Sequence, residues 1–166
     1  MRPLSRLFAM LFAAMIATGC SFHLRGQEGM RFNTIYLETA NPNTPFIKEL
    51  RRSLEASRVK MASSAQQADV VLNIVSEIPD KQILSLSSSG TVNEFQLFYR
   101  VSLRAYDLNK HEWIPAEELV LHRDFPYDVN NVLAMEAEES ILYQSMRTDM
   151  VQQIVLRLSR ANPQPR

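Results

Sequence analysis

Apolar and polar side chains alternate most regularly over residues 95–106, with the period of two that a half-buried β-strand requires. One face of this predicted strand is apolar throughout. The other face is polar but keeps aromatic rings, and it consists of Gln96, Phe98, Arg100, Ser102, Arg104 and Tyr106. An antiparallel strand with one face on the core and the other face uncovered has this pattern.

Further strand patterns are shorter, and they occupy residues 32–39, 70–78, 81–92 and 119–125, with a short strand or loop at 59–61. In residues 70–78, one face is expected to hold Val70, Leu72, Ile74 and Ile78. Pro79 and Asp80 follow directly, and we expect them to form the turn that separates this strand from the next.

Two segments have the three-and-four spacing of amphipathic helices. Thr44 and Pro45 predict the start of the first, which continues to about residue 57. The second covers residues 132–160, about 43 Å at 1.5 Å per residue. Its apolar face consists of Tyr143, Met146, Met150, Val151, Ile154 and Leu158. This order of elements predicts an α+β fold, with two helices packed on one face of a four- or five-stranded, largely antiparallel sheet.

The first 19 residues have the layout of a secretory signal peptide. Arg2 and Arg6 precede an apolar stretch over residues 7–17, which is shorter than the roughly 20 residues that a membrane span needs. Cys20 is the single cysteine of the chain and follows Gly19, an arrangement that resembles a bacterial lipobox. The resemblance implies cleavage before Cys20 and acylation of its sulfur and amino group. Cys20 is then a lipid anchor rather than a nucleophile.

This interpretation divides the chain into four parts. We expect residues 1–19 to be a removed signal peptide, residues 20–31 a lipidated tether, residues 32–160 one domain and residues 161–166 a flexible tail. The 18 Lys and Arg residues balance the 18 Asp and Glu residues, which argues against a nucleic-acid partner because such domains carry a basic excess. No cofactor is expected besides the covalent lipid on Cys20.

Catalytic and metal-binding motifs do not stand out. The histidines His23, His111 and His122 are far apart and lack zinc-ligand spacing. No Gly-x-Ser-x-Gly elbow is present, and the acidic residues near the start of the last helix fit stabilisation of its dipole. These acidic residues are Glu136, Glu138 and Glu139. We therefore expect no enzyme, although a hydrolase site built from distant residues stays open as a hypothesis.

The residues that follow Cys20 carry more specific information. Phe22, His23, Leu24 and Arg25 resemble the mature N-terminus of the LptE family, lipopolysaccharide (LPS)-assembly lipoproteins that usually begin Cys-Gly-aromatic-His-Leu-Arg. Ser21 departs from the usual glycine. Further similar segments follow in the family's order, at residues 41–45, 90–97 and 123–125 and in the long final helix. The resemblance covers nearly all of residues 20–160.

The resemblance implies a fold of two helices against four strands, so one of the candidate strands is expected to be short or absent. It also implies a non-enzymatic plug inside the barrel of LptD, the outer-membrane LPS translocon. Such a plug helps the barrel to assemble, binds LPS and is held in the outer membrane by a periplasmic-side lipid anchor. Ser21, which is not Asp, fits the outer-membrane sorting pattern of enteric-type lipoproteins.

The contact residues depart from the family pattern. Family members carry basic residues before Gly90 and early in the last helix, where this chain has residues 87–89, all serine, and 133–136 without a base. On charge and strand position, the candidate LPS or barrel contacts are Lys81, Arg100, Arg104, Phe98 and Tyr106. The alternatives are an ordinary solvated sheet face and, for function, an outer-membrane lipoprotein adaptor for another envelope protein without LPS binding.

Overall fold

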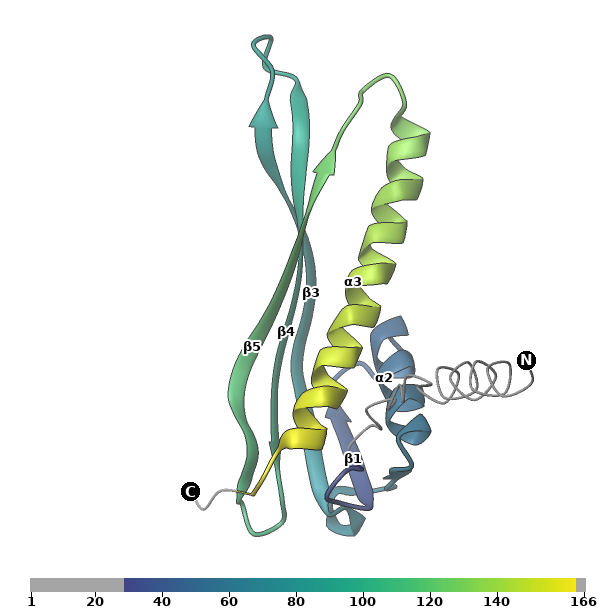
Figure 1. Cartoon of the computed structure of the whole chain (residues 1–166), viewed down its shortest axis with the longest axis vertical. Coiled ribbons are helices and arrows are strands. Elements are labelled where there is room, and N and C mark those ends of the chain that lie inside the picture. The colour runs from purple at the N-terminus through teal and green to yellow at the C-terminus, as the bar shows by residue number, and fades with distance from the viewer. Residues whose placement is uncertain (1–28, 164–166) are drawn as a thin grey trace, which may run out of the picture.

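Three long strands and one long helix give the molecule an elongated shape (Figure 1). The computed structural model describes residues 29–163, so the predicted signal peptide, Cys20 and the end of the tail lie outside the described residues. In chain order the elements are β1 (Thr34–Thr39), α2 (Pro45–Ala56), β2 (Lys60–Met61), the short 3₁₀ turn η1 (Ala65–Gln67), β3 (Val70–Leu86), β4 (Val92–Tyr106), β5 (Glu112–Pro126) and α3 (Val132–Arg160).

The strands form one five-stranded sheet in the order β2-β1-β3-β4-β5. β1 runs parallel to β2 and β3, whereas β3, β4 and β5 form antiparallel pairs. The predicted α+β fold is therefore confirmed. The two strands expected at residues 70–78 and 81–92 are a single strand, β3, and the fifth strand is β2, which has only two residues. Within the described residues, no helix combines the length and apolar character that crossing a bilayer requires.

The core lies between the sheet and the two helices, which pack on the same face (Figure 1). Thr44 caps α2, because its side-chain oxygen accepts a hydrogen bond of 3.2 Å from the backbone N–H of Ile47. The predicted alternation of β4 is confirmed, since its core-facing side chains are buried except Phe95, which is half-buried. The buried side chains are Leu97, Tyr99, Val101, Leu103 and Ala105, and they pack with Met146, Met150, Ile154 and Leu158 of α3.

The predicted turn at Pro79 and Asp80 is wrong, because β3 continues through both residues to Leu86. β1 pairs with β3 only as far as Ile74, so beyond that residue β3 is an edge strand, where a proline is tolerated. The chain reverses instead at residues 87–91. There Gly90 has a φ of 83° and donates a backbone hydrogen bond of 3.0 Å to Ser87.

The predicted position of Ile78 on the core face is also wrong. β3 and β4 pair in register at Ile74 and Leu103, but the register shifts before Ser76, which leaves Val75 as an inserted bulge residue. The bulge turns the side chains that follow it, as far as Ile83, to the opposite face, and the β3–β4 register shifts again beyond Ile83. Ile78 therefore lies opposite Arg100, away from the helices, with 48% of its surface exposed.

Strand β5 is longer than residues 119–125, because it begins at Glu112. Its first half was missed since Pro115, Glu117 and Glu118 break the apolar alternation. The β4–β5 register shifts in the same place, between Leu103 and Tyr106.

Candidate functional site

Within residues 29–163, no element covers the face of the sheet that points away from both helices, and we call it the outer face. β4 contributes the alternating residues that the sequence singled out, and their cross-strand neighbours come from β3 and β5. The outer face consists of Asn73, Ser76, Ile78, Asp80 and Gln82 of β3, Gln96, Phe98, Arg100, Ser102, Arg104 and Tyr106 of β4, and Glu118, Val120, His122 and Asp124 of β5.

Arg100 lies at the centre of the outer face. Its guanidinium carbon is 4.6 Å from the ring centroid of Phe98, and its Nη1 is 3.1 Å from Oδ2 of Asp80. Hydrogen bonds, first from Gln82 and then from Arg100, hold the pKa of the Asp80 carboxyl below its usual value. The cation is thus stacked on an aromatic ring and oriented by a carboxylate.

Arg104 occupies a second site of the same kind. Its guanidinium carbon is 5.1 Å from the ring centroid of Tyr106, and among the described residues it forms no ion pair within 4.0 Å. The Tyr106 hydroxyl donates a hydrogen bond of 3.1 Å to Glu38 of β1, which also accepts one from Asn73. Burial and then the Glu38 carboxylate raise the pKa of Tyr106. The Tyr106 ring on which Arg104 stacks is therefore held in place by the hydrogen bond to Glu38 of β1.

Apolar side chains flank these cations. Ile78 of β3 and Val120 of β5 are the cross-strand partners of Arg100 on either side, and both are among the exposed large apolar residues. The ring of Phe98 also lies 6.3 Å from that of His122. An apolar–cation–apolar row with stacked rings is more typical of an interface than of a solvated sheet face.

The structure separates Lys81 from the other predicted contact residues. Phe98, Arg100, Arg104 and Tyr106 share the outer face, but the bulge at Val75 turns Lys81 toward α3. There its Nζ lies 2.8 Å from Oε2 of Glu139 and 4.9 Å from the ring centroid of Phe95. Strand position alone did not reveal this, because a one-residue bulge leaves no mark in the apolar pattern.

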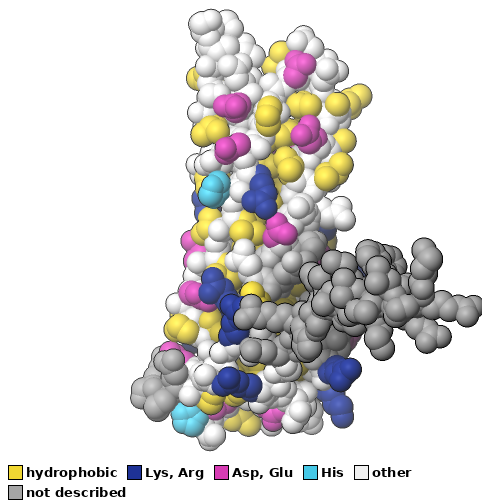
Figure 2. All heavy atoms as spheres, viewed as in Figure 1, with side chains coloured by type: hydrophobic (Ala, Val, Ile, Leu, Met, Phe, Trp, Pro, Cys, Tyr) yellow, Lys and Arg dark blue, Asp and Glu magenta, His cyan; other side chains and the backbone are white. Residues whose placement is uncertain are grey.

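Beyond Lys81, the sheet and α3 extend past most of the core to form what we call the distal end, residues 82–97 and 124–143, in which only Leu97 and Phe125 are buried (Figure 1). Phe95 contacts Phe125 and Tyr127 there, at centroid distances of 6.5 and 5.1 Å. Large apolar side chains are nevertheless exposed, as the upper part of Figure 2 shows. They are Ile83, Leu84, Leu86, Val129, Val132, Leu133 and Ile141.

Charge in the distal end has one sign. Its residues include no Lys or Arg, while the acidic residues are Glu94, Asp124, Asp128, Glu136, Glu138 and Glu139. The missing bases are evident from the sequence, whereas the exposed apolar surface is not predicted by its periodicity. Leu133 and Ile141 could have indicated this exposed surface, because neither belongs to the apolar face predicted for the helix.

Histidine and carboxylate side chains do not form a metal centre in the part of the chain that the structure describes, where no three potential ligands converge. His111 instead pairs with Asp107, with Nδ1 2.9 Å from Oδ2. His122 contributes a ring to the outer face, and His23 lies outside the described residues.

The comparisons with known proteins decide the family. The model of the family LptE, described as lipopolysaccharide-assembly, matches residues 32–158. The chain belongs to the LptE family. It is 31% identical over 162 residues to an LPS-assembly lipoprotein LptE of Pectobacterium atrosepticum, which covers 95% of this chain and 87% of that protein. A relative of the same name from Yersinia pestis is 28% identical, over 88% of this chain and 71% of the relative.

Solved structures agree with the fold. An uncharacterized lipoprotein B from Nitrosomonas europaea is 36% identical with a TM-score of 0.72, over 83% of this chain and 90% of that chain. A rare lipoprotein B from Shewanella oneidensis is 23% identical with a TM-score of 0.69, over 77% and 95% of the two chains, and supports the fold alone. As an LptE-family lipoprotein, this chain acts in LPS assembly at the outer membrane, a non-enzymatic role.

Proposed function

We propose that this LptE-family protein is a lipid-anchored plug in the LptD barrel, where it supports barrel folding and the insertion of LPS into the outer leaflet. The observation that carries the proposal is the outer face, with Arg100 and Arg104 stacked on Phe98 and Tyr106 in a surface that none of the described residues covers.

A barrel lumen offers polar walls, so a plug needs a surface that is polar yet well packed. Arginine and aromatic residues are enriched in protein interfaces, because they add contact area together with directed hydrogen bonds. The stacking of Arg100 on Phe98 and its ion pair with Asp80 hold the guanidinium in one orientation before a partner arrives. Less side-chain entropy is then lost on binding.

The anchor in this proposal is acylated Cys20, held on the periplasmic side of the outer membrane. Cys20 precedes Phe32, the first buried residue, by twelve residues. An extended chain of that length spans about 40 Å. The tether is thus long enough for the domain to enter a barrel while its lipid stays in the surrounding bilayer.

LPS contact requires cations, because lipid A and the inner core carry phosphates. The distal end provides none, and Lys81 is engaged by Glu139. We therefore propose Arg100 and Arg104 as the phosphate contacts, whereas the exposed apolar residues of the distal end meet acyl chains or the barrel wall.

The test is copurification from host envelopes in mild detergent. The double variant Arg100→Glu and Arg104→Glu should bring down at least about tenfold less LptD, since juxtaposed like charges cost several kcal/mol. Lys48→Glu with Arg51→Glu, which makes the same charge change on exposed positions of α2, is the matched control and should retain LptD. Unchanged LptD with both variants would remove the outer face from the proposal.

The adaptor alternative is favoured by one observation, the absence of basic residues from the distal end. It requires that the unaltered chain copurify with a different envelope protein as its main partner. It also requires that depletion of the chain leave folded LptD and LPS export at normal levels.

A further inference from the structure

The positive charge of the molecule gathers at the end opposite the distal end, where the chain enters the domain and α3 terminates. We call this the tether end. Its basic residues are Arg31, Arg58, Lys60, Lys110, Arg157 and Arg160. Figure 2 shows dark blue side chains mainly in the lower half of the face in view. The molecule is thus polarised along its long axis.

Two of the acidic residues at the tether end, Asp69 and Asp107, have close hydrogen-bond partners. The Asp69 carboxylate accepts hydrogen bonds of 2.9 Å from the backbone N–H groups of Asn33 and Thr34, and these lower the pKa of Asp69 despite partial burial. Asp107 pairs with His111. The basic residues of this end outnumber its carboxylates, which also include Glu112 and Glu117, so the field that it presents to a partner is positive.

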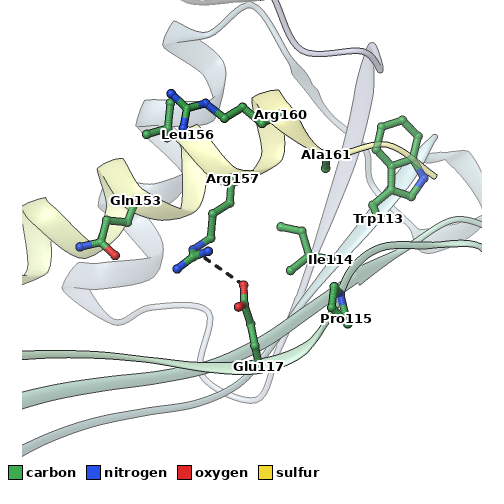
Figure 3. A pocket seen from close by; sticks show the side chains of 9 residues that line it. All are labelled: Trp113, Ile114, Pro115, Glu117, Gln153, Leu156, Arg157, Arg160 and Ala161. Atoms are coloured by element: carbon green, nitrogen blue, oxygen red, sulfur yellow. Dashed lines mark ion pairs between the residues drawn. The ribbon is translucent and has the colours of Figure 1, made fainter. Parts of the chain in front are cut away.

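A cavity of about 510 Å³ lies within this basic region, between the start of β5 and the last turns of α3 (Figure 3). Its walls are unlike. Trp113, Ile114 and Pro115 of β5 supply an apolar side, whereas α3 supplies Leu156 and the guanidinium groups of Arg157 and Arg160. Such a cavity suits a ligand with an anionic group next to an apolar one.

Both guanidinium groups are available for a ligand. Arg157 Nε lies 3.7 Å from Oε1 of Glu117, and the two side chains are 44% and 30% exposed, so this ion pair is weak. Arg160 forms no ion pair within 4.0 Å among the described residues. Both arginines also lie in the last helical turn and complement the helix dipole, so a test must separate binding from helix stability.

The wall of the cavity is in direct contact with the base of the tether. Phe32 packs edge-on against Trp113, at a ring-centroid distance of 5.4 Å and an interplanar angle of 89°. A lipid on Cys20 keeps this end of the domain near the bilayer surface. Tryptophan and arginine beside exposed apolar side chains are the residues that favour the headgroup region.

We infer that the tether end is a second membrane contact, in which the cavity takes the headgroup phosphate of an anionic phospholipid on its basic side, lined by Arg157 and Arg160. Trp113 and Leu156 then lie against the apolar part of the same lipid. The inference rests on the proposed anchor for its orientation, but it assigns a separate binding site, remote from the outer face.

The experiment uses the full mature chain with Cys20→Ala, so that no acyl chain contributes to binding. Cosedimentation compares vesicles of phosphatidylethanolamine with vesicles that also contain phosphatidylglycerol. We expect at least about tenfold tighter binding to the anionic vesicles, weakened by salt as expected for a surface ion contact. Equal binding to both vesicles would overturn the inference.

Arg157→Glu with Arg160→Glu should reduce that binding at least about tenfold, whereas Lys48→Glu with Arg51→Glu should leave it within about twofold. If thermal unfolding shows that the charge reversal destabilises α3, the variant Arg157→Gln with Arg160→Gln takes its place. That variant should lose less of its binding to anionic vesicles than the charge reversal does. Unchanged binding in a folded Arg157 and Arg160 variant would contradict the inference. So would equally tight, Arg157-dependent binding to soluble polyglutamate, which indicates an acidic polypeptide instead.

The phospholipid-site inference and the plug proposal can be contradicted independently of each other. The Arg157 and Arg160 variants should still copurify LptD, whereas the Arg100 and Arg104 variant should lose LptD but keep its binding to anionic vesicles. Loss of both partners in every folded variant would show that the two surfaces are not separate sites.

Discussion

Tyr143 of α3 donates a hydrogen bond of 2.7 Å to the backbone carbonyl of Asp80 on β3, next to the ion pair of Lys81 with Glu139. These two contacts join the helix to the sheet at the point where the buried core gives way to the distal end. Apart from them, the distal half of α3 contributes few buried side chains. The pair of contacts therefore acts as a clamp on an otherwise lightly packed extension.

The clamp predicts a dependence on alkaline pH. Burial, followed by the Glu139 and Asp80 carboxylates, raises the pKa of Tyr143 from 10.0 to about 12. Because the folded-state pKa is the higher one, the contribution of Tyr143 is complete below pH 10 and is lost as the pH rises toward 12. Tyr143→Phe should reduce the loss of folding stability between pH 10 and 12. It should also increase amide exchange in residues 132–143 already at neutral pH. Unchanged exchange would contradict the clamp.

A second prediction concerns the link between α2 and β3. Thr44 accepts from Ile47 N–H and donates a hydrogen bond of 2.9 Å to Glu77, which also accepts one from the Tyr99 hydroxyl. Thr44→Ala should lower the free energy of unfolding by about 1–2 kcal/mol, because the helix cap and one Glu77 partner are both lost. Thr44→Ser keeps the hydroxyl and should cost less than half as much. Urea denaturation of the two variants makes the comparison, and equal losses would refute this role of the hydroxyl.

The periodic parts of the sequence predicted the fold well. The alternation over residues 95–106 identified β4 and both of its faces, and the spacing in residues 132–160 gave α3 with its buried methionines. These patterns are reliable because each of the two elements buries one face only, so its apolar residues recur with the period of that element. The outer face with Arg100 and Arg104 was found for the same reason.

The errors at Pro79, Ile78 and Lys81 have a common origin in β3. Pro79 resembled a turn, because the sequence does not reveal that β3 has lost its β1 neighbour at that point. The bulge at Val75 then reversed the faces of Ile78 and Lys81, which follow it. A bulge and an edge position are properties of strand pairing, and pairing depends on residues far away in the chain. The exposed distal end was missed because periodicity does not say which apolar residues lie beyond the core.

The distal end should tolerate polar substitutions without loss of stability. Leu133 is 83% exposed and Ile141 66% exposed, so Leu133→Asp with Ile141→Asp should change the free energy of unfolding by less than about 1 kcal/mol. If this surface meets the barrel wall or acyl chains, the same variant should lower LptD copurification severalfold. Leu108→Asp, at an exposed apolar residue of the β4–β5 turn, is the control that should retain LptD. Full copurification by the distal variant would exclude this surface from the interface.

The anchor prediction rests on Cys20, whose sulfur is the proposed attachment point of the lipid. Cys20→Ala should yield a folded chain that is lost from the outer-membrane fraction, because each buried methylene of an acyl chain contributes about 0.8 kcal/mol to membrane affinity. The tether-end contact alone is expected to be reversible and sensitive to salt. Washing the fractionated envelopes at high salt should therefore release the variant but not the unaltered chain. Efficient retention of Cys20→Ala after such a wash would show that the lipid is not what holds the protein in the outer membrane.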